Sequence, residues 1–381
     1  MSTTVCLLAD TLYYPKGGGH LWVYLNWALG LRAVGCRVIW LERTVPGNPA
    51  HEEQARIAAL KSNLERYGLA EELVLCSYTG EPTGEPLPRA AVEGCVEFEA
   101  AAEADLLLNL GYRISPELLG RFRRSALLDI DPGLLQVWMS QGQISIPPHD
   151  LYFTIGETVG QPQAKFPDTG LHWQYTPPCV ALDWWTAHQA PVDAPFTTVT
   201  HWSGKGWMED GGEAYRNDKR AGFLPYVDLP RSTAHPLELA LLLAPWEDDE
   251  RAALQQSGWR IRDAHTVAST PWDYQQYIYD SYGEFSCAKP TYVRLETAWI
   301  SDRTICYLAS GKPAVVQHTG DSRILPDSAG LFRFRNLEEA AHCVEKVEAD
   351  YERQCRLARA LAEEHFDAQK VVGHVLERAL A

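Results

Sequence analysis

The stretch from residue 279 to residue 320 most constrains the fold of this chain, because it predicts a helix and a buried strand joined by a tight turn. Ser301 followed by Asp302 has the form of a helix N-cap with an acidic first turn. Gly311 and Pro313 mark the turn after that helix, and the apolar run 314–316 then predicts a buried strand. Before the helix, residues 283–286 form a polar centre that is typical of a strand or a loop.

The start of the predicted helix is a candidate anion site. Exposed backbone N–H groups and the positive end of the helix dipole attract a diphosphate, and Arg303 in the first turn adds a full positive charge. Glu284 and Lys289 precede the helix, where a carboxylate suits sugar or ribose hydroxyls and a lysine suits phosphate. The alternative for these two residues is a solvated loop.

Composition limits the classes of protein that this chain can belong to. A length of 381 residues fits two domains of ordinary size. There is no apolar run of about 18 residues and no signal-peptide pattern, so we expect no integral membrane segment and a cytoplasmic location. The formal net charge of −16 argues against nucleic acid or an anionic membrane as a partner. Nine cysteines without a C-x-x-C pair favour reduced thiols over zinc or disulfides.

The first half of the chain alternates predicted strands and helices. An apolar run over 4–9, a glycine-rich turn, a helical pattern to Leu31 and a strand at 38–41 form a unit of Rossmann type. Its glycines do not form G-x-G-x-x-G, so a dinucleotide site has little support. We predict further helices over 50–67 and 90–104, and further strands over 73–75, 105–110, 126–130 and 149–157.

The second half repeats this alternation after a Pro-rich stretch, and we place the linker near 183–195. A strand at 196–200 leads into a glycine-bearing loop with Lys205, and a strand at 259–263 leads into His265. Residues 237–243 fit either a helix or a buried strand. We also predict helices over 219–230 (with a turn), 274–282, 337–346, 351–364 and 371–380.

The order of polar loop, short helix, A-S-G-K-P turn, apolar strand and Thr319-Gly320 resembles the donor half of GT-B glycosyltransferases. The signature GEFSxAK followed by SDRxxCYLASGxP more closely resembles uncharacterised bacterial family-1-type glycosyltransferases. The resemblance implies an α/β fold with two Rossmann-like domains facing each other across a cleft. It implies an acceptor-binding domain over 1–185, a nucleotide-sugar-binding domain over 186–360, and a terminal helix over 361–381 that returns to the first domain.

The same resemblance implies roles for particular residues. His20 takes the position of the general base, with a helix cap or a plain acceptor contact as the alternative. Asp131 is the first choice and Asp129 the second for a carboxylate that orients His20, although Asp131-Pro132-Gly133 also fits a simple turn. The expected donor-binding residues are Lys205, which is equally a plain loop lysine, His265 at the level of the nucleobase, Glu284, Lys289, Ser301, Asp302, Arg303, Thr319 and Gly320.

The chain departs from the retaining members of this fold. They carry E-x7-E before the G-x-P turn, and Ala298 and Cys306 stand at those two positions here. The expectation is therefore an inverting enzyme, with a UDP- or dTDP-sugar as donor substrate and no separate cofactor. No D-x-D pattern suggests a metal site, and helix dipole and basic side chains can replace a metal. The acceptor is a small molecule, a glycan or a protein.

Three other functions remain open at this stage. A sugar-nucleotide epimerase of the same fold would bind the donor without an acceptor. A non-catalytic nucleotide-sugar or glycan-binding protein would bind the donor and show no turnover. A nucleotide-dependent dehydrogenase has the least support, because the glycine fingerprint is missing.

Overall fold

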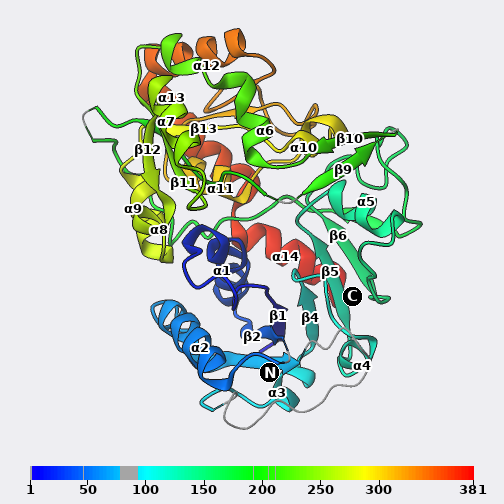
Figure 1. Cartoon of the computed structure of the whole chain (residues 1–381). Coiled ribbons are helices and arrows are strands. Elements are labelled where there is room, and N and C mark those ends of the chain that lie inside the picture. Colours follow the sequence, from blue (N-terminus) through cyan, green and yellow to red (C-terminus); the bar gives the residue numbers. More distant parts are fainter. Residues whose placement is uncertain (1, 46, 78–92, 192, 205, 211) are drawn as a thin grey trace. The chain divides into compact units, whose positions relative to one another are not determined.

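The computed structural model describes residues 2–45, 47–77, 93–191, 193–204, 206–210 and 212–381 (Figure 1). The chain divides into two compact units, which we describe separately. Unit 1 contains Met1–Gln161, Phe166–Ala181 and Ala368–Ala381, and unit 2 contains Pro162–Lys165 and Leu182–Asp367. Apart from the short segment 162–165, the chain enters unit 2 at residue 182 and returns to unit 1 at residue 368. The sequence analysis placed these two divisions at 185/186 and 360/361, which is a few residues later for the first and a few residues earlier for the second.

Unit 1 is built on a seven-stranded, fully parallel sheet with the order β3-β2-β1-β4-β5-β6-β7. Its central strands β1 and β4 are buried along nearly their whole length, as expected for a parallel sheet covered on both faces. The strands are β1 (Thr4–Leu8), β2 (Arg37–Thr44), β3 (Leu73–Ser77), β4 (Leu106–Asn109), β5 (Ser125–Asp129), β6 (Leu151–Thr154) and β7 (Trp173–Tyr175).

The helices of unit 1 include one from the end of the chain. Helix α14 lies beside α1 (Figure 1), and Gly30 of α1 permits this contact because a Cβ there would be 2.7 Å from the Cβ of Ala368. Val371, Val372 and Val375 of α14 are buried, each contributing about 1.5–3 kcal/mol by burial. The helices are α1 (Gly18–Ala33), α2 (Ala50–Glu65), α3 (Phe98–Ala102), α4 (Pro116–Leu119), α5 (Leu134–Ser140) and α14 (Ala368–Ala379), with a 3₁₀ turn at Ala70–Glu72.

The predicted helix over 90–104 is wrong in length. Residues 90–92 lie outside the described residues, and Val96 instead forms a parallel bridge to Val74 of β3. Only Phe98–Ala102 is helical, because the extended backbone at Val96 extends the edge of the sheet.

Unit 2 contains a six-stranded parallel sheet with the order β12-β11-β8-β13-β14-β15. The undecided segment 237–243 is strand β11, whose five leading residues are all buried because it lies inside the sheet between β12 and β8. The strands are β8 (Phe196–His201), β11 (Leu237–Leu242), β12 (Arg260–Asp263), β13 (Gly283–Ser286), β14 (Ala314–Gln317) and β15 (Leu331–Phe334).

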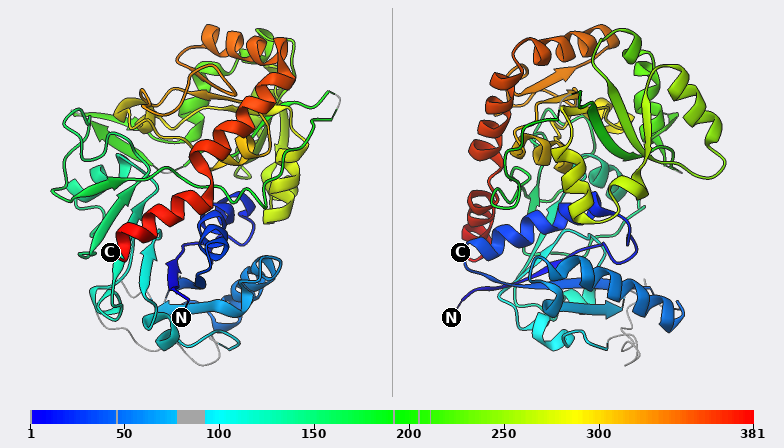
Figure 2. Two further views of the ribbon diagram at one scale, coloured as in Figure 1. Left: turned by 180° about the vertical axis from the view of Figure 1, so that it is seen from behind. Right: turned by 90° about the vertical axis from the view of Figure 1, so that its left-hand side faces the viewer.

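Helices surround this second sheet, and α12 and α13 lie next to each other in both views of Figure 2. An antiparallel hairpin of β9 (Trp207–Asp210) and β10 (Glu213–Arg216) follows β8, a feature that the sequence analysis missed. The helices are α6 (Lys219–Phe223), α7 (Asp248–Gln256), α8 (Ala264–Val267), α9 (Pro271–Tyr279), α10 (Pro290–Leu295), α11 (Asp302–Ala309), α12 (Leu337–Ala349) and α13 (Tyr351–Leu361). Leu224–Tyr226 and Leu229–Arg231 are 3₁₀ turns, and Ala362–Phe366 is a π-helical turn.

Both sheets are doubly wound, and each has one point at which the strand order reverses. The strand order reverses between β1 and β4 in unit 1 and between β8 and β13 in unit 2. In doubly wound sheets, ligands bind at the carboxyl ends of the strands at such a switch point. Among the described residues, no helix combines the length and apolar composition needed to cross a membrane.

Candidate functional site

Arg303 lies at the switch point of unit 2, where it connects the two diverging strands. Strands β8 and β13 pair at Phe196–Gly283 and Thr197–Glu284. Beyond that pairing, Arg303 Nη1 donates to the carbonyl oxygen of Val199 at 3.1 Å, and Nη2 donates to Ser286 Oγ. The guanidinium of Arg303 thus fills the point at which the two strands separate.

A buried carboxylate fixes this guanidinium. Arg303 Nε donates to Glu284 Oε1 at 2.7 Å, and Glu284 is fully buried within β13. Burial is the largest influence and lowers the pKa of Arg303, but the charge and hydrogen bond of Glu284 together with Tyr274 and Tyr307 outweigh it, so that the pKa is raised. The structure therefore places Glu284 inside the sheet against Arg303, and a direct contact of Glu284 with sugar hydroxyls stays a prediction.

Lys219 adds a second cation at this place, and the sequence analysis missed it. Lys219 Nζ donates to the carbonyl oxygen of Cys287, just after β13. Helix α6 comes this close because of Gly222, where a Cβ would be 2.1 Å from the carbonyl oxygen of Ala288. Burial and the charges of Arg303 and Lys289 lower the pKa of Lys219 to about 7. A depressed lysine pKa beside two other cations marks a positive region that an anion would stabilise.

A small pocket lies next to these cations. Its volume of about 20 Å³ has room for roughly one water molecule. Ser301, which lines the pocket, caps α11 as the sequence predicts, by accepting from the backbone N–H of Arg303 at 3.3 Å. The lining residues are Ser286, Cys287, Ala288, Trp299, Ile300, Ser301, Thr304, Val316, Gln317 and Thr319.

The loop between α10 and α11 borders the same pocket and is strained. Glu296 and Ala298 have left-handed backbones, with φ of 48° and 57°. In the part of the chain that the structure describes, buried Thr297 Oγ1 and Trp299 Nε1 have no hydrogen-bond partner. Such strain and unpaired polar atoms concentrate at functional sites, because folding alone does not favour them.

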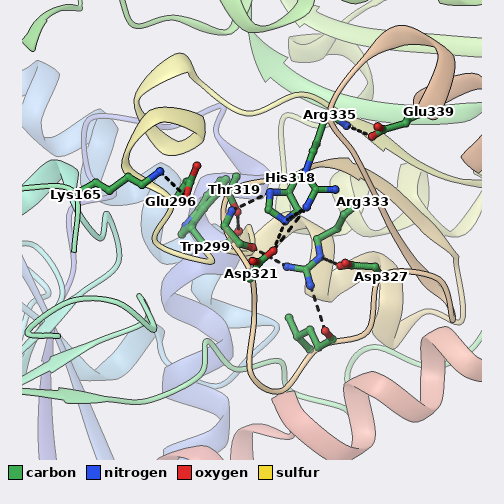
Figure 3. Close-up of polar contacts among 12 residues, drawn as sticks. Lys165, Glu296, Trp299, His318, Thr319, Asp321, Asp327, Arg333, Arg335 and Glu339 are labelled. Carbon is green, nitrogen blue, oxygen red and sulfur yellow. Dashed lines mark hydrogen bonds and ion pairs between the residues drawn. The ribbon is translucent and has the colours of Figure 1, made fainter. Parts of the chain in front are cut away.

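Thr319 and Gly320 hold this loop in place. Thr319 Oγ1 donates to the carbonyl oxygen of Trp299 at 2.6 Å (Figure 3). Gly320 has φ of +119°, and a Cβ there would be 2.7 Å from the carbonyl oxygen of Glu296. Both residues therefore support the pocket through the loop, and a direct donor contact stays a prediction for each.

Figure 3 also shows a polar cluster after β14 and β15. His318 Nε2 lies 3.1 Å from Asp321 Oδ1 and 2.8 Å from Arg335 Nη2. Arg333 donates to the carbonyl oxygen of Gly320 at 3.1 Å and pairs with Asp327. These contacts hold the loop 318–327 against the edge of the sheet.

The other predicted donor residues are less closely grouped. Lys289 is the N-cap residue of α10 and is partly buried, and Asp302 is the first residue of α11. His265 is exposed in α8, where its backbone N–H donates to Asp263 Oδ1 at 2.9 Å. Lys205 lies outside the described residues.

His20 lies at the switch point of unit 1. Its Nε2 is 2.8 Å from the carbonyl oxygen of Asp10, directly after β1. Because a carbonyl oxygen only accepts, Nε2 is the protonated nitrogen, and Nδ1 carries the lone pair when the ring is neutral. The ring centroids of Tyr14 and Tyr24 lie 4.4 and 5.4 Å away. The geometry thus gives His20 a basic nitrogen in a fixed ring.

A buried carboxylate fixes the loop that carries Asp10. Glu42, at the end of β2, accepts from the backbone N–H groups of Thr11 at 3.0 Å and Leu12 at 3.3 Å, and from Trp40 Nε1 at 3.0 Å. Burial raises the pKa of Glu42, and these hydrogen bonds limit the shift. Glu42 is a positioning residue that the sequence analysis did not single out.

The two candidate carboxylates after β5 differ in their surroundings. Asp129 is fully buried and accepts from Gln136 Nε2 at 3.0 Å and Thr154 Oγ1 at 2.9 Å. Burial raises the pKa of Asp129 to about 7. Asp131 is partly buried, accepts from Tyr112 at 3.2 Å, and is one of the charges that raise the pKa of Tyr24. Since the Asp10 carbonyl already orients His20, the orienting role of Asp131 stays a prediction.

Similar proteins are found by comparing structures and not by comparing sequences. No protein-family profile matches the chain, and no curated protein matches it by sequence. HepE of Anabaena, solved with UDP and glucose, is similar over 99% of both chains, with a TM-score of 0.58 and 13% identity. Sucrose-phosphate synthase of Thermosynechococcus elongatus is similar over 99% of this chain and 98% of its own, with a TM-score of 0.54 and 11% identity. An α-glucosyltransferase, solved with UDP and a 13-mer DNA, matches over 100% of both chains at a TM-score of 0.57 and 9% identity.

The chain has the GT-B fold of glycosyltransferases. The likeness to these enzymes extends over the whole chain, and the two parallel sheets with their switch points agree with it. At this low identity the likeness shows the fold, and function must be argued from the site. Within the described ranges, no group of three or more His, Cys, Asp and Glu side chains could hold a metal ion.

Proposed function

We propose that this protein transfers a sugar from a nucleoside-diphosphate sugar to a nucleophile of an acceptor, with UDP or dTDP as the nucleotide. The observation that carries the proposal is the pair of cations Lys219 and Arg303 at the switch point of unit 2, with Lys289 close enough for its charge to help lower the pKa of Lys219. HepE, solved with UDP and glucose, supports a nucleotide-sugar donor for this fold. Because the whole chain has a net charge of −16, a local group of cations stands out as a place for an anionic ligand.

These cations suit the leaving group of a glycosyl transfer. As the bond from the sugar to the diphosphate breaks, negative charge grows on the diphosphate. Lys219 and the start of α11 stabilise that charge, and Arg303 adds a guanidinium whose orientation Glu284 fixes. These fixed charges support a mechanism that does not depend on a metal.

We assign the role of general base to His20. Its Nδ1 takes the proton of the acceptor hydroxyl while the oxygen attacks the anomeric carbon, and the nucleoside diphosphate leaves. A single displacement of this kind inverts the anomeric centre. Ala298 and Cys306 support inversion, because neither provides a carboxylate where retaining members of the fold carry one.

A donor screen tests the proposal. UDP-, dTDP- and GDP-sugars are added to the full chain, with thermal shift and released nucleoside diphosphate as readouts. We expect one donor to raise the melting temperature and to be slowly hydrolysed, with water as the acceptor. Lys219→Met should weaken the thermal shift, whereas His20→Ala should keep it and lose release about 10²–10⁴-fold. His51→Ala, an exposed histidine of α2, is the matched control.

The outcomes separate this proposal from its rivals. If no nucleotide raises the melting temperature, the donor site is wrong. Donor binding with no release in the wild type, and with no effect of His20→Ala, indicates a non-catalytic binding protein. Formation of a second nucleotide sugar without free nucleotide, followed by NMR, indicates an epimerase.

A further inference from the structure

The hairpin of β9 and β10 carries an exposed aromatic ring that the proposed donor site does not use. Trp207 has 60% of its surface exposed, although tryptophan is usually well buried. The guanidinium carbon of Arg216 lies 5.8 Å from the centre of its ring. Trp207 and Arg216 are directly paired across the hairpin, so the cation supports one face of the ring.

The alternation of the two strands gives this hairpin two different faces. Met208 is buried and its partner Tyr215 is partly buried, so this pair packs inward. The pairs Trp207–Arg216 and Glu209–Ala214 point the other way, and all four residues are exposed. The outward face therefore combines a flat ring, a guanidinium and a carboxylate, and the small Ala214 leaves room between them.

The hairpin is fixed to the elements that form the donor site. Tyr215 and Thr291 of α10 bond through their hydroxyls at 3.1 Å, and the guanidinium carbon of Arg294 lies 4.0 Å from the centre of the Tyr215 ring. Asn217 Oδ1 accepts from the backbone N–H of Thr291 at 3.1 Å. Two residues further on, the chain reaches Lys219 of the proposed donor site. A ligand on the outward face is thus held by a fixed part of unit 2.

We propose that the outward face of this hairpin binds a saccharide, with a pyranose ring stacked on Trp207 and its hydroxyls bonded to Glu209 and Arg216. The apolar C–H face of a sugar ring suits an aromatic plane, and carboxylate and guanidinium are strong hydrogen-bond partners for hydroxyls. The exposed carboxylate of Glu209 offsets the charge of Arg216, so the face carries no net charge and favours a neutral polyhydroxyl ring over a phosphate. The inference rests on the proposed function and deepens it, because it adds a saccharide site to the unit that carries the proposed donor site.

The test measures saccharide binding without any nucleotide. Saturation-transfer NMR is recorded with the methyl glycosides of glucose, galactose, mannose and N-acetylglucosamine, and with maltotriose and chitotriose. We expect at least one of these to bind, with saturation strongest on the ring protons of one face. Trp207→Ala should weaken binding about tenfold or more, as loss of a central contact residue does. Trp207→Phe should keep most of it, because a flat ring remains.

Trp246→Ala is the matched control. Trp246 is 83% exposed in the same unit, outside the hairpin, and its loss should leave saccharide binding unchanged. Because Trp207 is exposed, its replacement should not unfold the hairpin, and Arg216→Ala provides a second variant. The thermal shift with UDP should be the same in Trp207→Ala and in the wild type.

Three results would overturn the proposal: no saccharide binds to the wild type, Trp207→Ala binds as well as the wild type, or Trp207→Ala loses UDP instead of the saccharide. The last result would assign the hairpin to the nucleotide. A different result would contradict the proposed function: no nucleotide would raise the melting temperature of the wild type, whereas the saccharide would still bind and would still depend on Trp207.

Discussion

Arg303 and Glu284 form an ion pair of 2.7 Å at the switch point of the unit 2 sheet, and the Glu284 side chain is fully buried. The pair holds a guanidinium at the point where β8 and β13 separate. A buried pair of this kind makes the site sensitive to the loss of either partner, because the remaining charge has no solvent to stabilise it.

Arg303→Met should lower the free energy of unfolding by about 3–5 kcal/mol, because it leaves Glu284 buried without its cation. Urea denaturation measures the change. Arg353→Met is the control, since Arg353 and its partner Asp350 are both more than half exposed and such pairs contribute about 0–1 kcal/mol.

The double variant Arg303→Met with Glu284→Met removes both charges. It should recover much of the stability lost in the single variant, because no unpaired charge remains. Equal destabilisation of the single and double variants would contradict a role for the ion pair in the fold.

Lys219→Met should stabilise the protein in the absence of ligand, because it removes a partly buried cation near Arg303 and Lys289. The pKa of Lys219 is about 7 in the folded protein, below its ordinary value of 10.5. The unfolded chain therefore binds more protons between these values, and wild-type stability rises with pH across this window. The advantage of Lys219→Met should be full below about pH 7 and should decline as the pH rises towards 10.5.

Melting temperatures at several pH values between 6 and about 10 follow this difference. Lys346→Met, an exposed lysine of α12, should show no such pH dependence. A Lys219→Met variant that is less stable than the wild type at pH 6 would show that its contact with Cys287 outweighs the repulsion.

Binding of UDP should take up a proton through Lys219. At pH 8 the amine is mostly uncharged, since its pKa is about 7, and a bound diphosphate raises that pKa again. Titration calorimetry in phosphate and in Tris should give two different binding enthalpies. Their difference should equal the difference between the ionisation enthalpies of the two buffers, multiplied by nearly one proton. The difference should almost vanish in Lys219→Met, and an unchanged difference would place the proton elsewhere.

Gly30→Ala should destabilise unit 1 by about 1–3 kcal/mol, because the new Cβ would come within 2.7 Å of Ala368 Cβ and push α14 away from α1. Gly373→Ala in α14 is the matched control, since no atom lies within 4 Å of its added Cβ. That variant should gain about 0.5–1 kcal/mol from reduced backbone entropy in the unfolded chain. Urea denaturation compares the two, and similar effects would show that α1 and α14 do not pack as described.

Several elements could be predicted because their causes are local. Ser301 caps α11, and Gly311, with φ of +67°, ends it before β14, as the spacing of these residues indicates. The GT-B fold was expected from the resemblance of this segment order to GT-B glycosyltransferases, and the structural likenesses confirm it. Residues 237–242 stayed undecided because a strand inside a parallel sheet has no alternation that separates it from a buried helix.

The candidate site depends on contacts that no local pattern reveals. Lys219 and Cys287 are 68 residues apart, and they meet only because Gly222 lets α6 approach the chain after β13. The sequence predicts a ligand contact for Glu284 because a carboxylate accepts hydrogen bonds from sugar hydroxyls, and the structure adds a contact with Arg303, which depends on the buried position of Glu284 in β13.

The sequence by itself determined most of the strands and helices and several of their caps, since these follow from periodicity and backbone preference over a few residues, and the class of fold followed from the resemblance of its segment order to GT-B glycosyltransferases. Only the tertiary structure decided which cations gather at the switch point, which nitrogen of His20 is held by Asp10, and which face of the β9–β10 hairpin is exposed. The reason is physical: a charge or a hydrogen bond acts over a few ångströms, and residues far apart in the chain reach that distance only through the packing of the whole unit.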